Sequence, residues 1–304
     1  MGDTSLDVCD AQRTADLLAF PALVKALRVT VADHARGAIL APERQVLPFP
    51  QGGVMLSMPA TARDIGIHKL VNVVPANKTM GLPTIHGVVS AYDSATGRPL
   101  VVLDGPTVTA RRTAALSMLG IQAFRPTPTC VALIGTGTQA SGHAEALAAL
   151  FPGLRTAIIG RSRDSADAFI ARHKHPGLEL FAADRVPADT DVVITLTTSA
   201  TPVYTEPAGA GRLVIGVGAY KPDLAEIGPD TLAGSDIYVD DLAGARHEAG
   251  DLIQARVDWQ RVKPLSEALT APLPTRPVVF KTVGCAAWDL SAARCALAAL
   301  QSAR

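Results

Sequence analysis

The spacing of hydrophobic residues changes along the chain and predicts its organisation. A helical pattern runs over residues 10–36, with Pro21 acceptable in a first turn. Strand-like runs then follow one another closely, over residues 39–47, 54–60, 65–74, 84–92 and 99–103. Residues 93–97, Asp-Ser-Ala-Thr-Gly, suit a hairpin turn between the last two runs. Closely spaced strands with short loops predict an antiparallel or mixed sheet here.

A second pattern begins after a helical stretch over residues 108–123 and the chain-breaking segment 126–128, Pro-Thr-Pro. Strand-like runs now alternate with helices, at residues 130–134, 156–159, 178–181, 191–197, 212–218 and 236–240. This alternation predicts a parallel, doubly wound sheet. A run over 278–283 leads into an amphipathic helix over 288–300. Because that helix has no partner of its own in the sequence, we expect it to pack on the first domain.

The strand at 130–134 runs directly into a glycine-rich turn and a helix-like stretch. Gly135 allows a tight turn, Gly137 lets the backbone approach a pyrophosphate, and Ala140 is small enough for close helix–sheet packing. Free N–H groups at the helix start attract phosphates. The motif predicts a Rossmann-type dinucleotide site; a plain strand–turn–helix is the alternative. The predicted cofactor contacts are Gly135, Thr136, Gly137, Thr138, Gln139 and Ala140.

The end of the second strand of this unit bears on the choice of cofactor. Sites for NAD usually place an acid there for the ribose 2′-hydroxyl, whereas Arg accommodates a 2′-phosphate. This chain has Arg161, Ser162 and Arg163, and no acid before Asp164. The sequence therefore predicts that NADP(H) is preferred, with NAD(H) possible. The alternative is that both arginines are merely solvated at a helix start.

Composition excludes several classes of function. The 304 residues include 28 basic and 28 acidic side chains, so nothing indicates a nucleic-acid or anionic-membrane partner. No run of 18 apolar residues predicts a membrane span. The four cysteines lie far apart and the seven histidines do not cluster, so we expect neither a metal site nor a disulfide framework. These features predict a reduced, cytoplasmic protein.

Two cationic residues fall on apolar faces. Period-two alternation over residues 65–73 places Lys69 among isoleucines and valines. Arg112 lies within the apolar stripe of the helix over 108–123. A buried ammonium or guanidinium is costly unless it is paired. A ligand carboxylate held between Lys69 and Arg112 would account for both; the alternative is that Lys69 snorkels to solvent.

The chain resembles the ornithine cyclodeaminase/μ-crystallin superfamily over about residues 20 to 300. The matching motifs are Gly81-Leu82-Pro83-Thr84, Asp93-x-x-x-Gly97-x-Pro99, Asp104-Gly105, Arg112-Thr113-Ala114-Ala115, Gly135-x-Gly137-x-x-Ala140, Thr197-Thr198-Ser199, Glu248-Ala249-Gly250-Asp251-Leu252, Phe280-Lys281-x-Val283-Gly284 and Asp289-Leu290. The resemblance implies an α/β fold with two domains. A dinucleotide-binding Rossmann domain spans residues 121–283. A discontinuous α+β substrate-binding and dimerisation domain spans residues 1–120 and 284–304.

The resemblance also implies roles for residues. The substrate carboxylate is expected at Arg44, Lys69 and Arg112, with Thr84 nearby, and Lys69 and Arg112 are the expected catalytic residues. Tyr220 and Gly284 complete the expected substrate contacts. The nicotinamide is expected beside the segment from Thr195 through Thr197 and Thr198, beside Val217, and at the turn of Val283 and Gly284. Family members pair their strand-rich domains, so we expect a homodimer.

One departure separates the branches of the family. Cyclodeaminases carry an Asp after the fifth Rossmann strand, and alignment on Pro222 places Tyr220 there. The resemblance therefore favours an NAD(P)H-dependent reductase of cyclic imine (ketimine) carboxylates, such as Δ1-pyrroline-2-carboxylate or Δ1-piperideine-2-carboxylate. The alternatives are an NAD⁺-dependent ornithine cyclodeaminase, an alanine-type dehydrogenase, and a non-catalytic NADPH-dependent binder of small ligands.

Overall fold

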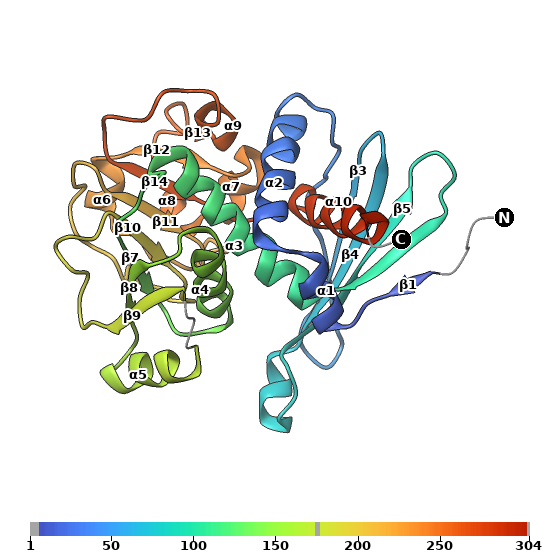
Figure 1. Cartoon of the computed structure of the whole chain (residues 1–304), viewed down its shortest axis with the longest axis horizontal. Helices are drawn as coiled ribbons and strands as arrows, with labels where there is room; N and C mark the ends of the chain where they lie inside the picture. The colour runs from blue at the N-terminus through green and yellow to red at the C-terminus, as the bar shows by residue number, and fades with distance from the viewer. Residues whose placement is uncertain (1–5, 174–176, 303–304) are drawn as a thin grey trace. The chain divides into compact units, whose positions relative to one another are not determined.

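The chain forms two compact units in this computed structural model, which describes residues 6–173 and 177–302 (Figure 1). One unit comprises Met1–Arg112 and Cys285–Arg304, and the other comprises Thr113–Gly284. The chain first crosses from one unit to the other between Arg112 and Thr113, inside helix α3 (Gly105–Phe124). The sequence placed that crossing at residues 120/121, later in the same helix. The predicted fold class, a doubly wound parallel sheet with an α+β domain, is confirmed.

The first unit contains a six-stranded sheet of order β1-β6-β5-β4-β3-β2. Strand β1 runs parallel to β6, and the remaining neighbours are antiparallel. The sheet is therefore mixed, as predicted. The strands are β1 (Asp7–Val8), β2 (Gln45–Pro48), β3 (Val54–Thr61), β4 (Ile65–Val73), β5 (Ile85–Asp93) and β6 (Pro99–Asp104), with a 3₁₀ turn, η1 (Pro75–Met80), before β5. The strand expected over residues 39–47 does not form as one element. Leu40 forms an isolated bridge with Thr61, and regular pairing begins only with β2 at Gln45.

The first unit also contains helices α1 (Ala11–Leu17), α2 (Phe20–Ala35) and α10 (Ala286–Ser302), together with the start of α3. In Figure 1 α10 (red) lies beside α2 (blue). The C-terminal helix packs on the first unit, as predicted, through contacts such as Trp288 with His34. The single helix expected over residues 10–36 is wrong. The chain breaks at Leu18 and restarts so that Pro21, which lacks an N–H, lies in the first turn of α2.

The second unit contains an eight-stranded sheet of order β13-β12-β14-β11-β10-β7-β8-β9, and every neighbouring pair is parallel. The strands are β7 (Cys130–Ile134), β8 (Leu154–Ile159), β9 (Leu178–Ala182), β10 (Val192–Thr195), β11 (Leu213–Gly216), β12 (Asp236–Val239), β13 (Lys263–Pro264) and β14 (Val278–Lys281). The connecting helices are α4 (Thr138–Leu150), α5 (Arg163–Arg172), α6 (Pro229–Ala233), α7 (Leu242–Glu248), α8 (Gly250–Gln254) and α9 (Leu265–Ala268).

The strand order of the second unit locates a ligand crevice. From β7 the chain proceeds to β8 and β9 on one side, and then returns to β10 and β11 on the other. In open α/β sheets, ligands bind outside the carboxyl ends of the strands at such a reversal. The reversal lies between β7 and β10, so the glycine-rich turn after β7 is at the crevice.

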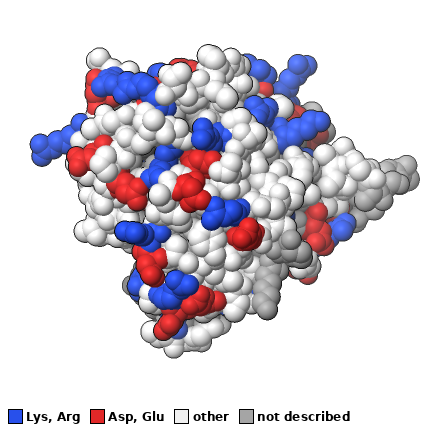
Figure 2. Space-filling model, turned by 60° about the vertical axis from the view of Figure 1, so that its left-hand side comes forward, with Lys and Arg blue, Asp and Glu red and all other residues white. Residues whose placement is uncertain are grey.

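On the face shown in Figure 2, basic and acidic side chains are interspersed, so neither sign of charge covers a broad area there.

Among the helices within residues 6–173 and 177–302, none has the length and apolar composition needed to cross a bilayer.

Candidate functional site

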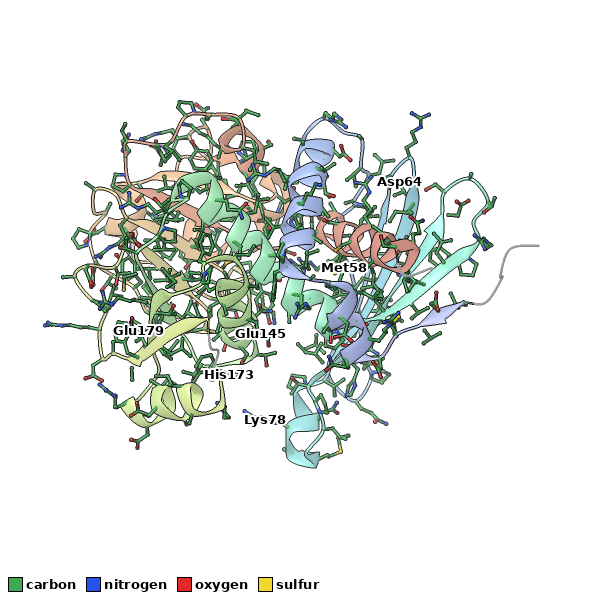
Figure 3. All side chains as sticks on the ribbon, in the orientation of Figure 1. Met58, Asp64, Lys78, Glu145, His173 and Glu179 are labelled. Carbon is green, nitrogen blue, oxygen red and sulfur yellow. The ribbon has the colours of Figure 1, made fainter. Side chains whose placement is uncertain are left out.

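A buried ion cluster lies in the first unit, centred on the carboxylate of Asp289. Lys69, on β4, is only 3% exposed, and its Nζ donates to Asp289 Oδ1 at 3.1 Å and Oδ2 at 3.2 Å. Its partner across the sheet is Met58 of β3, labelled in Figure 3. The alternation of β4 thus turns Lys69 inward. The reading in which Lys69 snorkels to solvent is therefore wrong.

Arg112 joins the same carboxylate. It is 6% exposed, and its Nε lies 3.3 Å from Asp289 Oδ1. A ligand carboxylate is therefore not needed to account for burial of Lys69 and Arg112, because α10 supplies an internal one. The sequence carried one signal of this: Asp289 lies in a run of small and apolar residues that is buried throughout. Acidic residues are seldom fully buried unless they are paired.

The cluster still carries an excess of positive charge. The pKa of Lys69 is lowered to about 8, chiefly by burial and also by the charges of Arg112 and Arg44, whereas Asp289 opposes the shift. Two cations, Lys69 and Arg112, thus contact one carboxylate, so a second anion is electrostatically favoured there. Thr84 precedes β5, where its carbonyl accepts from the Val74 N–H. The structure therefore brings Lys69, Arg112 and Asp289 together, and the charge of Arg44 acts on Lys69.

The turn after β7 in the second unit has the geometry of a phosphate cradle. Gly135 has φ of +127°, and a Cβ there would lie 2.7 Å from the Leu196 carbonyl oxygen, so this position requires glycine. A Cβ at Gly137 would meet nothing within 4 Å. The protein itself therefore leaves open space at the N-cap of α4, beside free N–H groups of a 13-residue helix. These residues fit a dinucleotide pyrophosphate.

The remaining residues of the motif lie around this helix start. Ala140 is fully buried, as close helix–sheet packing requires. Thr138 and Gln139 form the first turn of α4, and Thr136 precedes it. The Gln139 Oε1 is buried without a hydrogen-bond partner among the described residues. An unpaired buried acceptor of this kind suits a donor supplied from outside the chain.

Arg161, Ser162 and Arg163 follow β8, and they differ in whether other protein groups already bind their side chains. All three are exposed. The Ser162 hydroxyl caps α5 by accepting from the Ser165 N–H, and Arg163 pairs with Asp167 along the helix at 3.4 Å. Arg161 forms no ion pair within residues 6–173 and 177–302. Of the predicted 2′-phosphate contacts, Arg161 is thus the strongest candidate.

The loops after β10 and β11 gather around one carboxylate that the sequence reasoning missed. Glu226 is fully buried and accepts hydrogen bonds from Thr195, Thr197, Gly218 and Ala219. The strand-like runs expected over 191–197 and 212–218 therefore stop early. Thr197 and Gly218 donate their N–H groups to Glu226, so they do not continue the sheet. Thr198 is exposed and Val217 is buried.

Another buried carboxylate holds the turn after β14. Asp240 accepts from the N–H groups of Val283, at 3.0 Å, and Gly284, at 2.9 Å, and from the Thr282 hydroxyl. Burial raises the pKa of Asp240, and these donors oppose the shift. The turn of Val283 and Gly284 is therefore fixed from within the second unit.

Tyr220 lies in the loop after β11 and is 40% exposed. Its N–H donates to the Gly218 carbonyl at 3.2 Å, and the Lys221 Nζ lies 5.8 Å from the centre of its ring. No carboxylate occupies this position. Across residues 6–173 and 177–302, no group of three or more His, Cys, Asp or Glu side chains is arranged to hold a metal ion.

Comparison with known proteins identifies the family. The model of the ornithine cyclodeaminase/mu-crystallin family matches residues 6–303. The chain belongs to this family. The resemblance predicted from the motifs is thereby confirmed.

Relatives within this family include cyclic imine reductases. The chain is 57% identical to Δ1-pyrroline-2-carboxylate reductase 2 of Burkholderia ambifaria, covering 97% of this chain and 96% of the relative. It is 56% identical to the Δ1-pyrroline-2-carboxylate/Δ1-piperideine-2-carboxylate reductase of Azospirillum brasilense, over 98% and 97%. A mouse relative, ketimine reductase mu-crystallin, is 28% identical over 95% and 93%.

Solved structures of the family share the fold. The structure of Thermococcus litoralis Δ1-pyrroline-2-carboxylate reductase in complex with NADH and L-proline matches with a TM-score of 0.87 at 22% identity, covering 98% of each chain. A lysine cyclodeaminase matches with a TM-score of 0.83 at 27% identity, over 98% and 93%. Because members with different activities share it, the fold alone does not separate reductase from cyclodeaminase.

Proposed function

We propose that this chain reduces the C=N bond of Δ1-pyrroline-2-carboxylate and Δ1-piperideine-2-carboxylate with a nicotinamide cofactor. The observation that carries the proposal is the buried cluster of Lys69 and Arg112 on Asp289, whose excess positive charge suits a substrate carboxylate. Relatives at 56–57% identity bear names of reductases for these substrates. A pure ligand binder has less need of a buried lysine whose pKa lies near neutrality.

The chain's residues divide the work of the reaction. Arg112 and Arg44 bind the substrate carboxylate through charge-assisted hydrogen bonds. Lys69, as an ammonium, holds the same group and donates a proton to the imine nitrogen. With a pKa of about 8, it is a competent acid near neutral pH. A dihydronicotinamide, when bound by the second unit, would supply the hydride for the imine carbon. The double bond thus gains one hydride and one proton and becomes a cyclic amino acid.

The cofactor is held by the second unit. Gly135, Gly137 and the start of α4 bind the pyrophosphate, with Thr136, Thr138, Gln139 and Ala140 around it. Arg161 binds a 2′-phosphate, so NADP(H) is preferred over NAD(H). Ser162 and Arg163 flank that phosphate. Thr195, Thr197, Thr198, Val217, Val283 and Gly284 surround the nicotinamide half, and Thr84 and Tyr220 complete the substrate contacts.

The second part of the proposal is a homodimer formed through the sheet of the first unit. The face of this sheet turned away from Lys69 carries Leu70 and Val88 as cross-strand partners. Val88 is 42% exposed, Leu47 of β2 is 52% exposed and Val8 of β1 is 73% exposed. Exposed apolar area of this kind marks an interaction surface. Light scattering should give the mass of a dimer, and Val88→Asp should shift it toward the monomer. A monomeric unmodified protein refutes this part.

One assay tests the proposed function directly. NADPH oxidation is followed with each cyclic imine acid, beside ammonia release from L-ornithine with NAD⁺. We expect NADPH consumption with the imines and no ammonia from L-ornithine. The reason is that Tyr220 is a neutral phenol at neutral pH and does not offer an anionic partner to an amine. Conversion of L-ornithine to proline by the unmodified protein would overturn the proposal.

A further inference from the structure

The carboxylate of Glu226 accepts hydrogen bonds from five donors, which lie at the end of β10 and in the loops after β10 and β11. Its Oε1 accepts from the Thr197 N–H at 2.5 Å and the Thr197 hydroxyl at 2.8 Å. Its Oε2 accepts from the Thr195 hydroxyl at 3.0 Å and from the N–H groups of Gly218 at 2.6 Å and Ala219 at 3.1 Å. Three of the five donors are backbone N–H groups, which cannot act as acceptors, so the arrangement needs a side chain that accepts at both oxygens.

Burial of the Glu226 carboxyl is partly offset by its neighbours. Desolvation raises the pKa of Glu226, and the nearby Lys281 and the hydrogen bonds from Thr197 oppose the shift without cancelling it. Lys281 is also fully buried, and its Nζ lies 2.7 Å from Asp251 Oδ2. The other oxygen of Asp251 accepts from the N–H groups of Glu226 and Ile227. Glu226 is thus held by its own backbone as well as by its side chain.

The two loops that Glu226 binds are in direct contact. A Cβ at Gly218 would lie 1.8 Å from the Thr197 carbonyl oxygen, so the loops pass one another with no room for a side chain. They follow β10 and β11, which are adjacent parallel strands. A shift in either loop therefore displaces the other, and Glu226 fixes both.

The strand order indicates which half of a dinucleotide these loops face. Pyrophosphate fits at the start of α4, after β7, and Arg161 follows β8 on one side of the reversal. The adenosine half therefore belongs to the β7 and β8 side. A Rossmann fold consists of two mononucleotide-binding halves, one on each side of the strand reversal. The nicotinamide nucleotide therefore belongs to the side of β10 and β11.

We infer that Glu226 is a positioning residue for the nicotinamide half of the cofactor. It holds the loops of Thr197 and Gly218 in the one arrangement that receives this half, and it does not touch the adenosine half. The inference rests on the proposed function, because it assumes that this unit binds NADPH.

The test compares two ligands on purified full-length protein. One is NADPH, and the other is 2′-phospho-ADP-ribose, which lacks the nicotinamide ring. In Glu226→Gln the new amide group faces backbone N–H donors, so the loops lose acceptors and separate. We expect affinity for NADPH to fall about 10-fold or more, with affinity for 2′-phospho-ADP-ribose changed by less than about 2-fold. Glu226→Asp keeps the charge on a shorter side chain and should give an intermediate ratio.

A matched control separates positioning from stability. Asp191 is a buried carboxylate at the opposite, amino-terminal edge of the same sheet, and it binds the N–H groups of Thr129 and Cys130. Asp191→Asn should lower the melting temperature without changing the ratio of the two affinities. If Glu226→Gln weakens both ligands equally, the inference is wrong. If Glu226→Gln does not fold, an unchanged ratio in Glu226→Asp overturns it. Failure of the unmodified protein to bind either ligand overturns the proposed function as well.

Discussion

Replacing Asp289 by Asn tests the ion cluster at its centre. The substitution preserves volume and removes a negative charge that Lys69 and Arg112 both contact. Asp289 raises the pKa of Lys69, whereas burial, Arg112 and Arg44 lower it, with a net value of about 8. Loss of an opposite charge at this distance lowers such a pKa by about 1–3 pH units.

The size of the expected effect follows from this shift. At neutral pH, a pKa of about 8 leaves about nine-tenths of Lys69 as the ammonium. A fall of about 2 pH units leaves about one-tenth, so kcat/KM for the imine at neutral pH should fall about 10-fold from this cause alone. The alkaline limb of the pH profile of kcat/KM, which the pKa of Lys69 predicts near pH 8 in the unmodified protein, should move to lower pH by the same amount.

Steady-state rates of imine reduction across the pH range locate the alkaline limb of the kcat/KM profile, and thermal unfolding measures the stability of the variant. Removing one partner of a buried ion pair costs about 3–5 kcal/mol in general. The matched control is Asp64→Asn, which breaks a half-exposed pair with Arg294 in the same unit and should leave the limb unmoved (Figure 3 labels Asp64). If the limb of Asp289→Asn stays where it was, Asp289 does not set the protonation of Lys69.

Other predictions follow from the same geometry. Lys69→Ala should cut turnover by about 100-fold or more while cofactor affinity stays near normal, and full turnover refutes the assigned role. Arg161→Ala should narrow the difference in binding free energy between NADPH and NADH by about 1–3 kcal/mol; equal affinities in the unmodified protein refute the preference. Gly137→Ala should weaken cofactor binding at an unchanged melting temperature, whereas Gly135→Ala should lower the melting temperature, because only the latter Cβ meets the protein itself. The raised pKa values of the buried thiols Cys9, Cys130 and Cys295 lower stability as pH rises in this range, so the contribution of Lys69 is measured in a variant with these three cysteines changed to alanine. In that variant stability should rise with pH from about 8 to 10.5, because the folded state binds fewer protons at Lys69 than the unfolded state there; a flat profile contradicts this.

Local patterns in the sequence predicted the parts of the fold that depend on near neighbours. Period-two alternation identified β4 and the inward direction of Lys69, and the spacing of Gly135, Gly137 and Ala140 identified the turn into α4. The break at Leu18 was missed, because the apolar pattern continues through it and only the proline ahead marks a new start.

The parts that depend on distant residues could not be read from the pattern. Asp289 is 220 positions from Lys69, so no periodicity relates the two. Glu226 is an isolated acid in a loop, with nothing nearby to indicate that four residues would donate to it. In both cases the sequence showed a cation or a loop that needed a partner, and tertiary folding supplied the partner.

The discontinuous make-up of the first unit has a consequence for synthesis on the ribosome. Lys69 leaves the ribosome long before α10, which carries Asp289. At usual rates of elongation, the 220 intervening residues take about 10–40 s. During that time the Lys69 ammonium lacks its partner, the Asp289 carboxylate, so burying Lys69 in the interior of the first unit is unfavourable. The inserted unit, whose chain is complete earlier, is therefore free to fold first, and the nascent first unit waits for the last helix to be translated.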